Sequence, residues 1–225
     1  MQTYEIRPVA RIRSDFPQKF GIPRQSGLVD ALEARVEFLP PYDRPEALRG
    51  IEGFSHLWLI WGFTETMTEE FRPTVRPPRL GGNRRVGVFA SRAPYRPNGL
   101  GLSCVRLVRV EAGALVVAGA DLLDGTPIFD VKPYVPVSDL RPDAVGGYTE
   151  ETRTHRLRVD FPESLLALVP PEKRDALRGV LACDPRPGYE DDPQTVYGLA
   201  FAGLDVGFSV EGDILTVTRV SPVRE

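Results

Sequence analysis

Four short segments of this 225-residue chain carry the side chains that could do chemistry. They combine arginine, tyrosine, asparagine and aspartate with glycine and proline, and they lie at 19–27, 72–83, 90–101 and 121–127. The third holds two arginines, a tyrosine and an asparagine, a mixture suited to phosphate contact, base stacking and hydrogen bonds to base edges. In the fourth, Asp124 begins an Asp-Gly turn and could hold a ribose or an amine. Turns alone do not need so many guanidinium groups, but the spacing alone names no reaction.

Charged residues are distributed unevenly along the chain, although 28 basic and 31 acidic side chains give a net charge of only −3. Residues 1–106 carry a net +5 and residues 107–225 a net −8. The segment 71–110 contains nine arginines and no aspartate or glutamate. Such a segment produces a positive field that attracts phosphates, which arginine binds in a forked geometry. We therefore expect this segment to bind an anionic ligand, despite the acidic total.

Several common catalytic signatures are missing. The sequence has no G-x-G-x-x-G motif, no P-loop, no H-E-x-x-H motif and no G-x-S-x-G nucleophile elbow. Its two histidines and two cysteines are far apart in sequence, which predicts that no metal is bound. His56 lies in an apolar run and is expected to be a core residue, and Cys104 to be a small apolar side chain of a strand.

The elements that must position these segments read as strands in the N-terminal part. We expect them at 4–12, 34–39, 54–63, 86–90, 104–110, 115–120 and 128–135, with a hairpin turn at 111–114. Segment 54–63 is apolar at nearly every position, which predicts a strand buried on both faces. Strands at this short spacing favour a closed or nearly closed all-β unit.

The character of the chain changes after residue 140. A polar segment at 141–155 is expected to be a linker between a domain at 1–140 and a smaller one at 156–225. Helices after the prolines at 162 and 171, followed by strands at 196–201, 204–210 and 214–220, predict a C-terminal α+β domain. The predicted fold is thus mainly β: an N-terminal β-barrel without a Rossmann fold, and a small C-terminal α+β domain.

Targeting signals are also missing from the sequence. There is no run of about 18 apolar residues, the usual mark of a membrane-spanning helix, and no apolar stretch near the N-terminus. Two cysteines cannot form a disulfide framework, which fits a reducing compartment. We therefore expect a cytoplasmic protein without a membrane partner.

The motifs resemble those of one family. KFGIPRQSGLV, RGIEGFSHLWLIW, RPTVRPPRLGGN, YRPNGLGLS and DLLDGTPIFDVKPYVP are similar, in this order, to segments of TsaA-like proteins that methylate N6 of adenine 37 in tRNA with S-adenosylmethionine. DPRPGYEDD resembles the family's C-terminal module. The resemblance implies a β-barrel methyltransferase and a homodimer with cofactor sites near the subunit interface. It implies as substrate N6-threonylcarbamoyladenosine beside the anticodon.

The same resemblance assigns site residues. It implies that S-adenosylmethionine contacts Pro23, Arg24, Gln25, Arg92, Leu102, Asp124, Gly125, Thr126 and Pro127. Thr64 and Glu65 occupy cofactor positions where family members often have a His-Gln pair. Family members also often read R-P-N-P-I-G where this chain has RPNGLG, so we expect a more flexible loop here.

Roles in methyl transfer follow from that reading. We expect Asn98 and Tyr95 to be the catalytic residues, with Asn98 or Asp124 positioning N6 and Tyr95 stacking on the base. Arg76, Arg84 and Arg96 are expected to contact phosphates of the tRNA anticodon loop. Two alternatives stay open at this point: a non-catalytic RNA- or nucleotide-binding module, and a methyltransferase acting on another adenine-like substrate.

Overall fold

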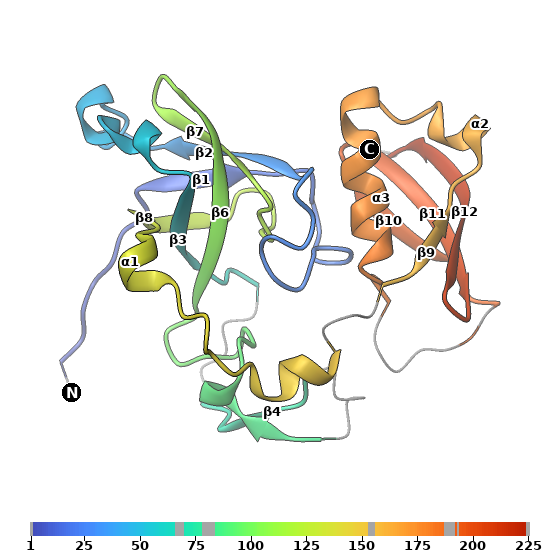
Figure 1. Cartoon of the computed structure of the whole chain (residues 1–225), viewed down its shortest axis with the longest axis horizontal. Coiled ribbons are helices and arrows are strands. Elements are labelled where there is room, and N and C mark those ends of the chain that lie inside the picture. Colours follow the sequence, from blue (N-terminus) through green and yellow to red (C-terminus); the bar gives the residue numbers. More distant parts are fainter. Residues whose placement is uncertain are drawn as a thin grey trace.

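The main unit of the structure is a closed antiparallel barrel of six strands in the order β1-β2-β7-β6-β3-β8. A four-stranded sheet forms a second unit, and a short two-stranded hairpin lies below the barrel (Figure 1). This computed structural model describes residues 2–65, 70–77, 84–152, 156–186, 192 and 194–223. The predicted fold class, a mainly β chain with a barrel and a small α+β unit, is confirmed.

The elements have the following bounds. The barrel strands are β1 (Ala10–Arg13), β2 (Glu33–Phe38), β3 (His56–Gly62), β6 (Leu100–Glu111), β7 (Ala114–Ala118) and β8 (Pro127–Pro133), and the hairpin strands are β4 (Thr74–Val75) and β5 (Val86–Gly87). The C-terminal unit contains β9 (Arg158–Asp160), α2 (Glu163–Leu166), α3 (Arg174–Ala182), β10 (Tyr197–Phe201), β11 (Leu204–Glu211) and β12 (Ile214–Pro222). One helical turn, α1 (Pro136–Asp139), follows the barrel, and 3-10 turns lie at Pro45–Leu48, Ile51–Gly53, Val88–Ala90, Gly147–Thr152 and Pro171–Lys173.

The two rims of the barrel carry different loops. Every pair of neighbouring strands is antiparallel, so β1, β3 and β7 run in one direction and β2, β6 and β8 in the other. The loops 14–32, 63–99 and 119–126 therefore all leave the same rim. Segment 39–55 and the β6–β7 turn lie at the opposite rim. The first of these ends is called the loop rim below.

Apolar side chains of alternate strand positions fill the barrel, as the period of two requires. The strand β1 shows the pattern clearly, with Ala10 and Ile12 fully buried and the arginines between them exposed. Inward residues of the other strands complete this core, among them Val36, Leu57, Leu59, Val105, Leu115, Val117 and Ile128. The result is a solid interior, so any ligand site lies on the barrel's surface or rims.

Three sequence-based expectations about the strands need correction. β1 begins at Ala10 rather than at residue 4, because the chain before it is extended and exposed. Only Val86 and Gly87 of segment 86–90 form a strand, and a 3-10 turn follows. β3 alternates between buried and half-buried positions, since only one of its faces points into the barrel.

The C-terminal unit is an α+β sandwich. Its sheet has the order β10-β11-β12-β9, and β9 is parallel to β12. Helix α3 lies along this sheet (Figure 1), and its buried face consists of Ala176, Leu177, Val180 and Leu181. The β10–β11 turn places both Ala202 and Gly203 at positive φ, the geometry that a tight two-residue hairpin requires. No helix among the described residues is long and apolar enough to cross a bilayer.

The loop 14–32 joins the barrel to the C-terminal unit. Three of its side chains, those of Phe16, Val29 and Leu32, belong to the same buried core as the C-terminal sheet. Gly21 lies so close to Leu199 that a Cβ atom at this position would come within 2.2 Å of the leucine Cδ1. The Lys173 ammonium adds an ion pair of 2.6 Å with Asp15. The loop's conformation therefore depends on contacts from both units. The division of the chain into domains at 140 and 156 stays a prediction.

Candidate functional site

The four chemically suggestive segments all belong to loops of the loop rim. Cross-loop bonds hold these loops together: the Gly27 N–H donates to the Gly119 carbonyl at 2.8 Å, and the Asp124 N–H to the Phe16 carbonyl at 2.8 Å. A bond of 2.8 Å from the Phe63 N–H to the Gly99 carbonyl joins the two ends of the loop 63–99. Closure of the barrel thus brings together segments that lie about a hundred residues apart in the chain.

Gln25 and Arg92, both expected to contact a cofactor, are direct partners at this rim. An Nη1–H of Arg92 donates to the Gln25 Oε1 at 2.6 Å, although the residues are 67 positions apart in sequence. The side-chain amide of Gln25 in turn donates to the Arg24 carbonyl at 2.6 Å. Next to it, the Ser26 hydroxyl accepts the Cys104 N–H of β6 at 3.1 Å. This contact fixes the loop 19–27 against the barrel wall.

A half-buried carboxyl group at the same rim, that of Asp121, was not assigned a role from the sequence. The Ser103 hydroxyl donates to the Asp121 Oδ1 at 2.6 Å and accepts the Trp61 indole N–H at 3.0 Å. Burial raises the pKa of Asp121, while the Ser103 hydrogen bond and the positive charge of Arg92 oppose the shift. Asp121 opens the segment DLLDG, but one aspartate between apolar residues gives no signal of a partner. The barrel pairing places it beside Arg92.

Glu65 and Lys19 form an ion pair that links two loops of the rim. The Lys19 Nζ lies 2.9 Å from the Glu65 Oε2, and both side chains are about half exposed. Thr64, beside it, is exposed. Where family members often carry His-Gln, this chain therefore uses a charged contact to the KFGIPRQ loop. An exposed pair of this kind contributes little to stability, about 0–1 kcal/mol.

Asp124 and its neighbours face β1. The Asp124 carboxylate accepts the Ser14 N–H at 3.0 Å and lies 3.6 Å from the Arg13 Nη1. Gly125 has a φ of +76°, which allows its N–H to bond the Ile12 carbonyl at 2.8 Å. Thr126 is buried and its hydroxyl donates to the Leu123 carbonyl, and Pro127 opens β8. These contacts shape the turn, and a role in cofactor binding stays a prediction.

The three remaining cofactor candidates differ in exposure. Pro23 is buried at the junction of the two units, and Leu102 of β6 is 49% exposed. An Nη2–H of Arg24 donates to the carbonyl of Arg186 at 3.2 Å, which links the loop to the C-terminal unit. Arg186 is itself buried and forms a bidentate pair with Asp184.

The segment 90–101 presents its polar side chains from turns. Asn98 is exposed and precedes Gly99, which has a φ of +57°. The Tyr95 ring lies under the Arg72 guanidinium at 5.4 Å. Arg96 is half-buried, and its Nη1 donates to the carbonyls of Val88 and Ser91 at 3.2 and 2.7 Å. Its guanidinium therefore holds the loop in place. The predicted contact with an RNA phosphate would use the same guanidinium group.

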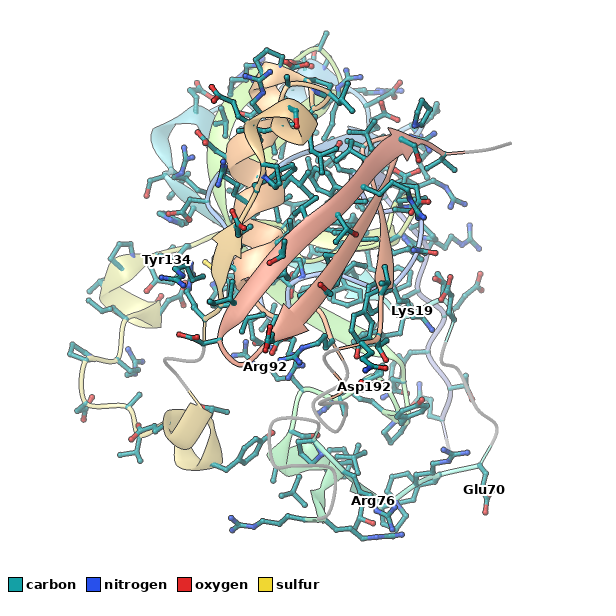
Figure 2. All side chains as sticks on the ribbon, turned by 90° about the vertical axis from the view of Figure 1, so that its right-hand side faces the viewer. Lys19, Glu70, Arg76, Arg92, Tyr134 and Asp192 are labelled. Carbon is teal, nitrogen blue, oxygen red and sulfur yellow. The ribbon has the colours of Figure 1, made fainter. Side chains whose placement is uncertain are left out.

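Arg76 and Arg84 are exposed near the hairpin β4–β5. Figure 2 shows Arg76 at the lower end of the molecule, well below Arg92 and Lys19. The basic surface thus extends from the rim to the hairpin. Residues 78–83, the remainder of the segment predicted at 72–83, lie outside the described residues.

The opposite rim of the barrel carries two hollows and His56, apart from the four chemically suggestive segments. Two open hollows of about 280 and 350 Å³ border segment 45–55 and the end of β6, and each is lined by both glutamate and arginine. His56 is also at this end of β3, where its Nδ1 lies 3.0 Å from the Ser55 hydroxyl oxygen.

Burial raises the pKa of the Cys104 thiol, with Asp139 adding to the shift, which disfavours a reactive thiolate. Among the described residues, no group of three metal-ligating side chains exists.

The geometry agrees with the comparison with known families. Residues 11–140 match the N-terminal domain of tRNA-methyltransferase O, and residues 154–223 match the C-terminal domain of the same family. The chain belongs to the tRNA-methyltransferase O family. The family resemblance inferred from the sequence motifs is confirmed.

Individual relatives extend this similarity over nearly the whole chain. A tRNA (adenine(37)-N6)-methyltransferase of Escherichia coli is 41% identical over 205 residues, which are 87% of each chain. A Pseudomonas aeruginosa protein whose assigned name is that of an S-adenosylmethionine-dependent methyltransferase is 44% identical over 221 residues, 91% of each chain. A crystal structure of TrmO from P. aeruginosa superposes with a TM-score of 0.81 and 36% identity, covering 99% of both chains.

Proposed function

We propose that this protein transfers a methyl group from S-adenosylmethionine to N6 of adenine 37 in tRNA, and that the adenine carries a threonylcarbamoyl group. The observation that carries the proposal is the match of both family domains to one chain whose predicted site loops meet at the loop rim. The curated relative that acts on adenine 37 supports the substrate, and the relative named for S-adenosylmethionine supports the cofactor.

The residues of the loop rim suit such a cofactor chemically. The Arg92 guanidinium is a forked cation that matches a carboxylate, such as that of the methionine moiety. Carboxylates at Asp121 and Asp124 provide acceptors for an amine or for ribose hydroxyls. Leu102 of β6, which is half exposed, offers an apolar contact. We assign Pro23, Arg24, Gln25, Arg92, Leu102 and the segment 124–127 to holding the cofactor.

Catalysis by this chain consists mainly of orientation. When bound, S-adenosylmethionine supplies an activated methyl group, so a protein nucleophile is not required. Asn98, whose amide both donates and accepts hydrogen bonds, orients N6, and Tyr95 stacks on the base. The rate enhancement comes from holding N6 in line with the methyl group, since orientation alone lowers the activation free energy of a bimolecular reaction by up to about 10 kcal/mol.

The proposal extends to assembly and location. Leu102, Arg24 and Arg92 are exposed on the single chain, which fits a site completed by a second copy in a homodimer. We also propose a cytoplasmic location, which the tRNA-modifying relatives support. Sedimentation of the purified protein with and without S-adenosylhomocysteine tests the dimer directly, and a single-chain mass under both conditions contradicts it.

Two measurements test the proposed reaction. Calorimetry with S-adenosylhomocysteine should give one binding event per chain, and methyl transfer should occur on tRNA that carries the threonylcarbamoyl group. Cofactor binding without transfer to any tRNA would favour a non-catalytic RNA-binding module. Transfer to a small adenine-containing compound but not to tRNA would favour another substrate. Mass spectrometry of tRNA from cells lacking the gene provides the control, because unchanged methylated threonylcarbamoyladenosine contradicts the proposal.

A further inference from the structure

Two phenylalanines near the hairpin β4–β5 are stacked on each other and exposed. The rings of Phe71 and Phe89 have centroids 6.4 Å apart and an interplanar angle of 29°. Phe71 is 55% exposed and Phe89 is 72% exposed, so neither belongs to the core of the barrel or of the C-terminal unit. Two large apolar rings that stay mostly in water forgo the hydrophobic stabilisation that burial would give. This pair, called the aromatic platform, is therefore a candidate binding surface.

Neighbouring contacts hold the platform in place. The Val88 N–H donates to the Pro73 carbonyl at 3.0 Å, which ties the two chain segments together next to the rings. Arg96 lies over the Phe89 ring, with its Cζ 5.9 Å from the ring centroid. The same guanidinium is anchored by the carbonyls of Val88 and Ser91. The ring and the cation above it are thus arranged before any ligand arrives, which lowers the entropy lost on binding.

Charge indicates what kind of ligand fits. The sequence from 71 to 110 has nine arginines and no carboxylate, and a second arginine, Arg72, lies over the exposed ring of Tyr95. A ligand for this surface must therefore offer both flat apolar faces and negative charge. Unpaired nucleotides have this combination, because their bases stack on aromatic rings and their phosphates bind arginine. A protein partner would need acidic and aromatic side chains together.

We propose that the aromatic platform stacks on an unpaired base of the RNA substrate, outside the position of the base that is methylated. The proposal rests on the proposed function for the identity of the RNA. Phe89 is three residues before Arg92, so their Cα atoms are at most about 11 Å apart. This span is about that of two or three stacked nucleotides. The platform therefore binds a base of the same anticodon loop, a few nucleotides from the target.

Ring removal should weaken RNA binding selectively. We expect Phe89→Ala and Phe71→Ala each to raise the Kd for an anticodon stem–loop RNA by about 5- to 150-fold, the effect of losing one base–aromatic stack. Binding of a fully paired RNA duplex should stay within about twofold, as for an ordinary surface substitution. A stem–loop with 2-aminopurine in the loop should show fluorescence quenching that Phe89→Ala abolishes.

Matched variants separate stacking from other effects. Phe89→Tyr keeps a ring and should bind the stem–loop like the unaltered protein, whereas Phe89→Leu keeps apolar area and should be impaired. Tyr4→Ala removes an exposed ring outside the basic segment and should leave RNA affinity unchanged. Calorimetry with S-adenosylhomocysteine should give the same Kd for all of these variants, which shows that the fold and the cofactor site are intact.

Three outcomes would contradict the proposal that the aromatic platform stacks on an RNA base. Unchanged stem–loop affinity of Phe89→Ala rules out base stacking, and equal binding by Phe89→Leu assigns the effect to apolar area alone. A lower mass of Phe89→Ala in sedimentation assigns the surface to contact between two copies of the chain. Failure of the proposed function is distinct, since it would be seen as absence of methyl transfer by the unaltered protein, whatever the variants do in RNA binding.

Discussion

Arg92 is the residue on which the candidate site depends most directly. It bonds Gln25 at 2.6 Å and its charge acts on Asp121, so one guanidinium connects three different loops of the loop rim. The sequence indicated that Arg92 and Gln25 could share a ligand. It did not indicate that they touch, because a bond between positions 25 and 92 requires the barrel to close first.

Replacing Arg92 should weaken cofactor binding. Arg92→Ala removes a charged hydrogen-bond donor, which corresponds to about a 10- to 150-fold higher Kd for S-adenosylhomocysteine in calorimetry. Arg106→Ala is the matched control, because Arg106 is an exposed arginine of β6 that pairs with His56 at the opposite rim. Equal losses for the two variants would mean that net charge, and not the position of Arg92, governs affinity.

The raised pKa of Asp121 predicts how the free energy of unfolding depends on pH. Burial raises its pKa, so the folded chain holds this proton more tightly than the unfolded chain does. Its contribution to the free energy of unfolding is then greatest below the ordinary aspartate pKa and falls as the pH rises through the raised value. Asp121→Asn does not titrate and can still accept the Ser103 hydrogen bond. The free energy of unfolding of this variant minus that of the unaltered protein should therefore increase with pH.

Urea unfolding at several pH values measures this difference. Asp30→Asn, at an exposed aspartate of the loop 14–32, controls for the change in net charge. A difference for Asp121→Asn that stays flat, or that decreases with pH, contradicts a raised pKa of Asp121 in the folded chain. The same titration should be visible in the pH dependence of cofactor affinity, because an ionised Asp121 attracts Arg92.

Among the elements, the loop 14–32 depends most on its surroundings. Its middle carries the predicted cofactor residues Pro23, Arg24 and Gln25, while its ends are packed into the C-terminal core. Phe20 stacks near Tyr197 and Phe208, with ring centroids 6.4 Å apart in both cases. The C-terminal unit therefore acts as a support for the cofactor loop, whatever further contact it makes with RNA.

A glycine pair tests this support. Gly21→Ala places a Cβ 2.2 Å from the buried Leu199 Cδ1 and imposes a positive φ of 89° on alanine. Gly203→Ala imposes a similar φ of 78° with no atom within 4 Å. We expect a loss of about 1–2 kcal/mol of unfolding free energy for Gly203→Ala. Gly21→Ala should lose about 1–3 kcal/mol more, because the core there is overpacked.

Of these two variants, only Gly21→Ala should also weaken cofactor binding. Gly21→Ala displaces the loop that carries Gln25, so its Kd for S-adenosylhomocysteine should rise by about tenfold, as for a lost hydrogen bond to a charged group. Gly203→Ala, in the β10–β11 turn, should bind normally. Cofactor binding by Gly21→Ala that matches the unaltered protein would show that the C-terminal core does not hold the loop in its binding conformation.

For the molecule as a whole, charge separation is the main property. Six arginines of the arginine-rich segment lie in the loop 63–99 of the loop rim, which includes the hairpin: Arg72, Arg76, Arg84, Arg85, Arg92 and Arg96. The acidic excess belongs to the later part of the chain. Figure 1 places the C-terminal sheet to one side of the barrel, away from the hairpin. RNA phosphates should therefore bind mainly at the loop rim and the hairpin, where these arginines are concentrated.

Salt dependence of tRNA binding measures this arrangement. Arg76→Ala and Arg84→Ala should each reduce the magnitude of the slope of log K against log salt by about 0.7, the value for one phosphate of a single strand. Arg158→Ala, at an exposed arginine of β9, should leave the slope unchanged. Slopes that change equally in all three variants would indicate that tRNA senses only the net charge of the molecule.

Much of the fold could be predicted because it depends on local pattern. The hairpin β6–β7 follows from apolar strands around a glycine turn, and the buried face of α3 follows from helical spacing. The two errors at β5 and β1 have one cause: a strand exists only where a partner supplies hydrogen bonds. Residues 4–8 have the right composition but form no strand, and after Val86 and Gly87 pair with β4 the chain turns into a 3-10 helix at 88–90.

The sequence by itself determined which chemical groups are present: the arginines without carboxylates, the glycine and proline turns, and motifs specific enough to indicate the family. These are properties of residue types at short spacing. Tertiary structure alone decided that Arg92 meets Gln25, that Asp121 is half-buried within reach of the Arg92 charge, and that the loop 14–32 shares a core with the C-terminal unit. Such contacts join residues many positions apart, and only barrel closure brings them within bonding distance.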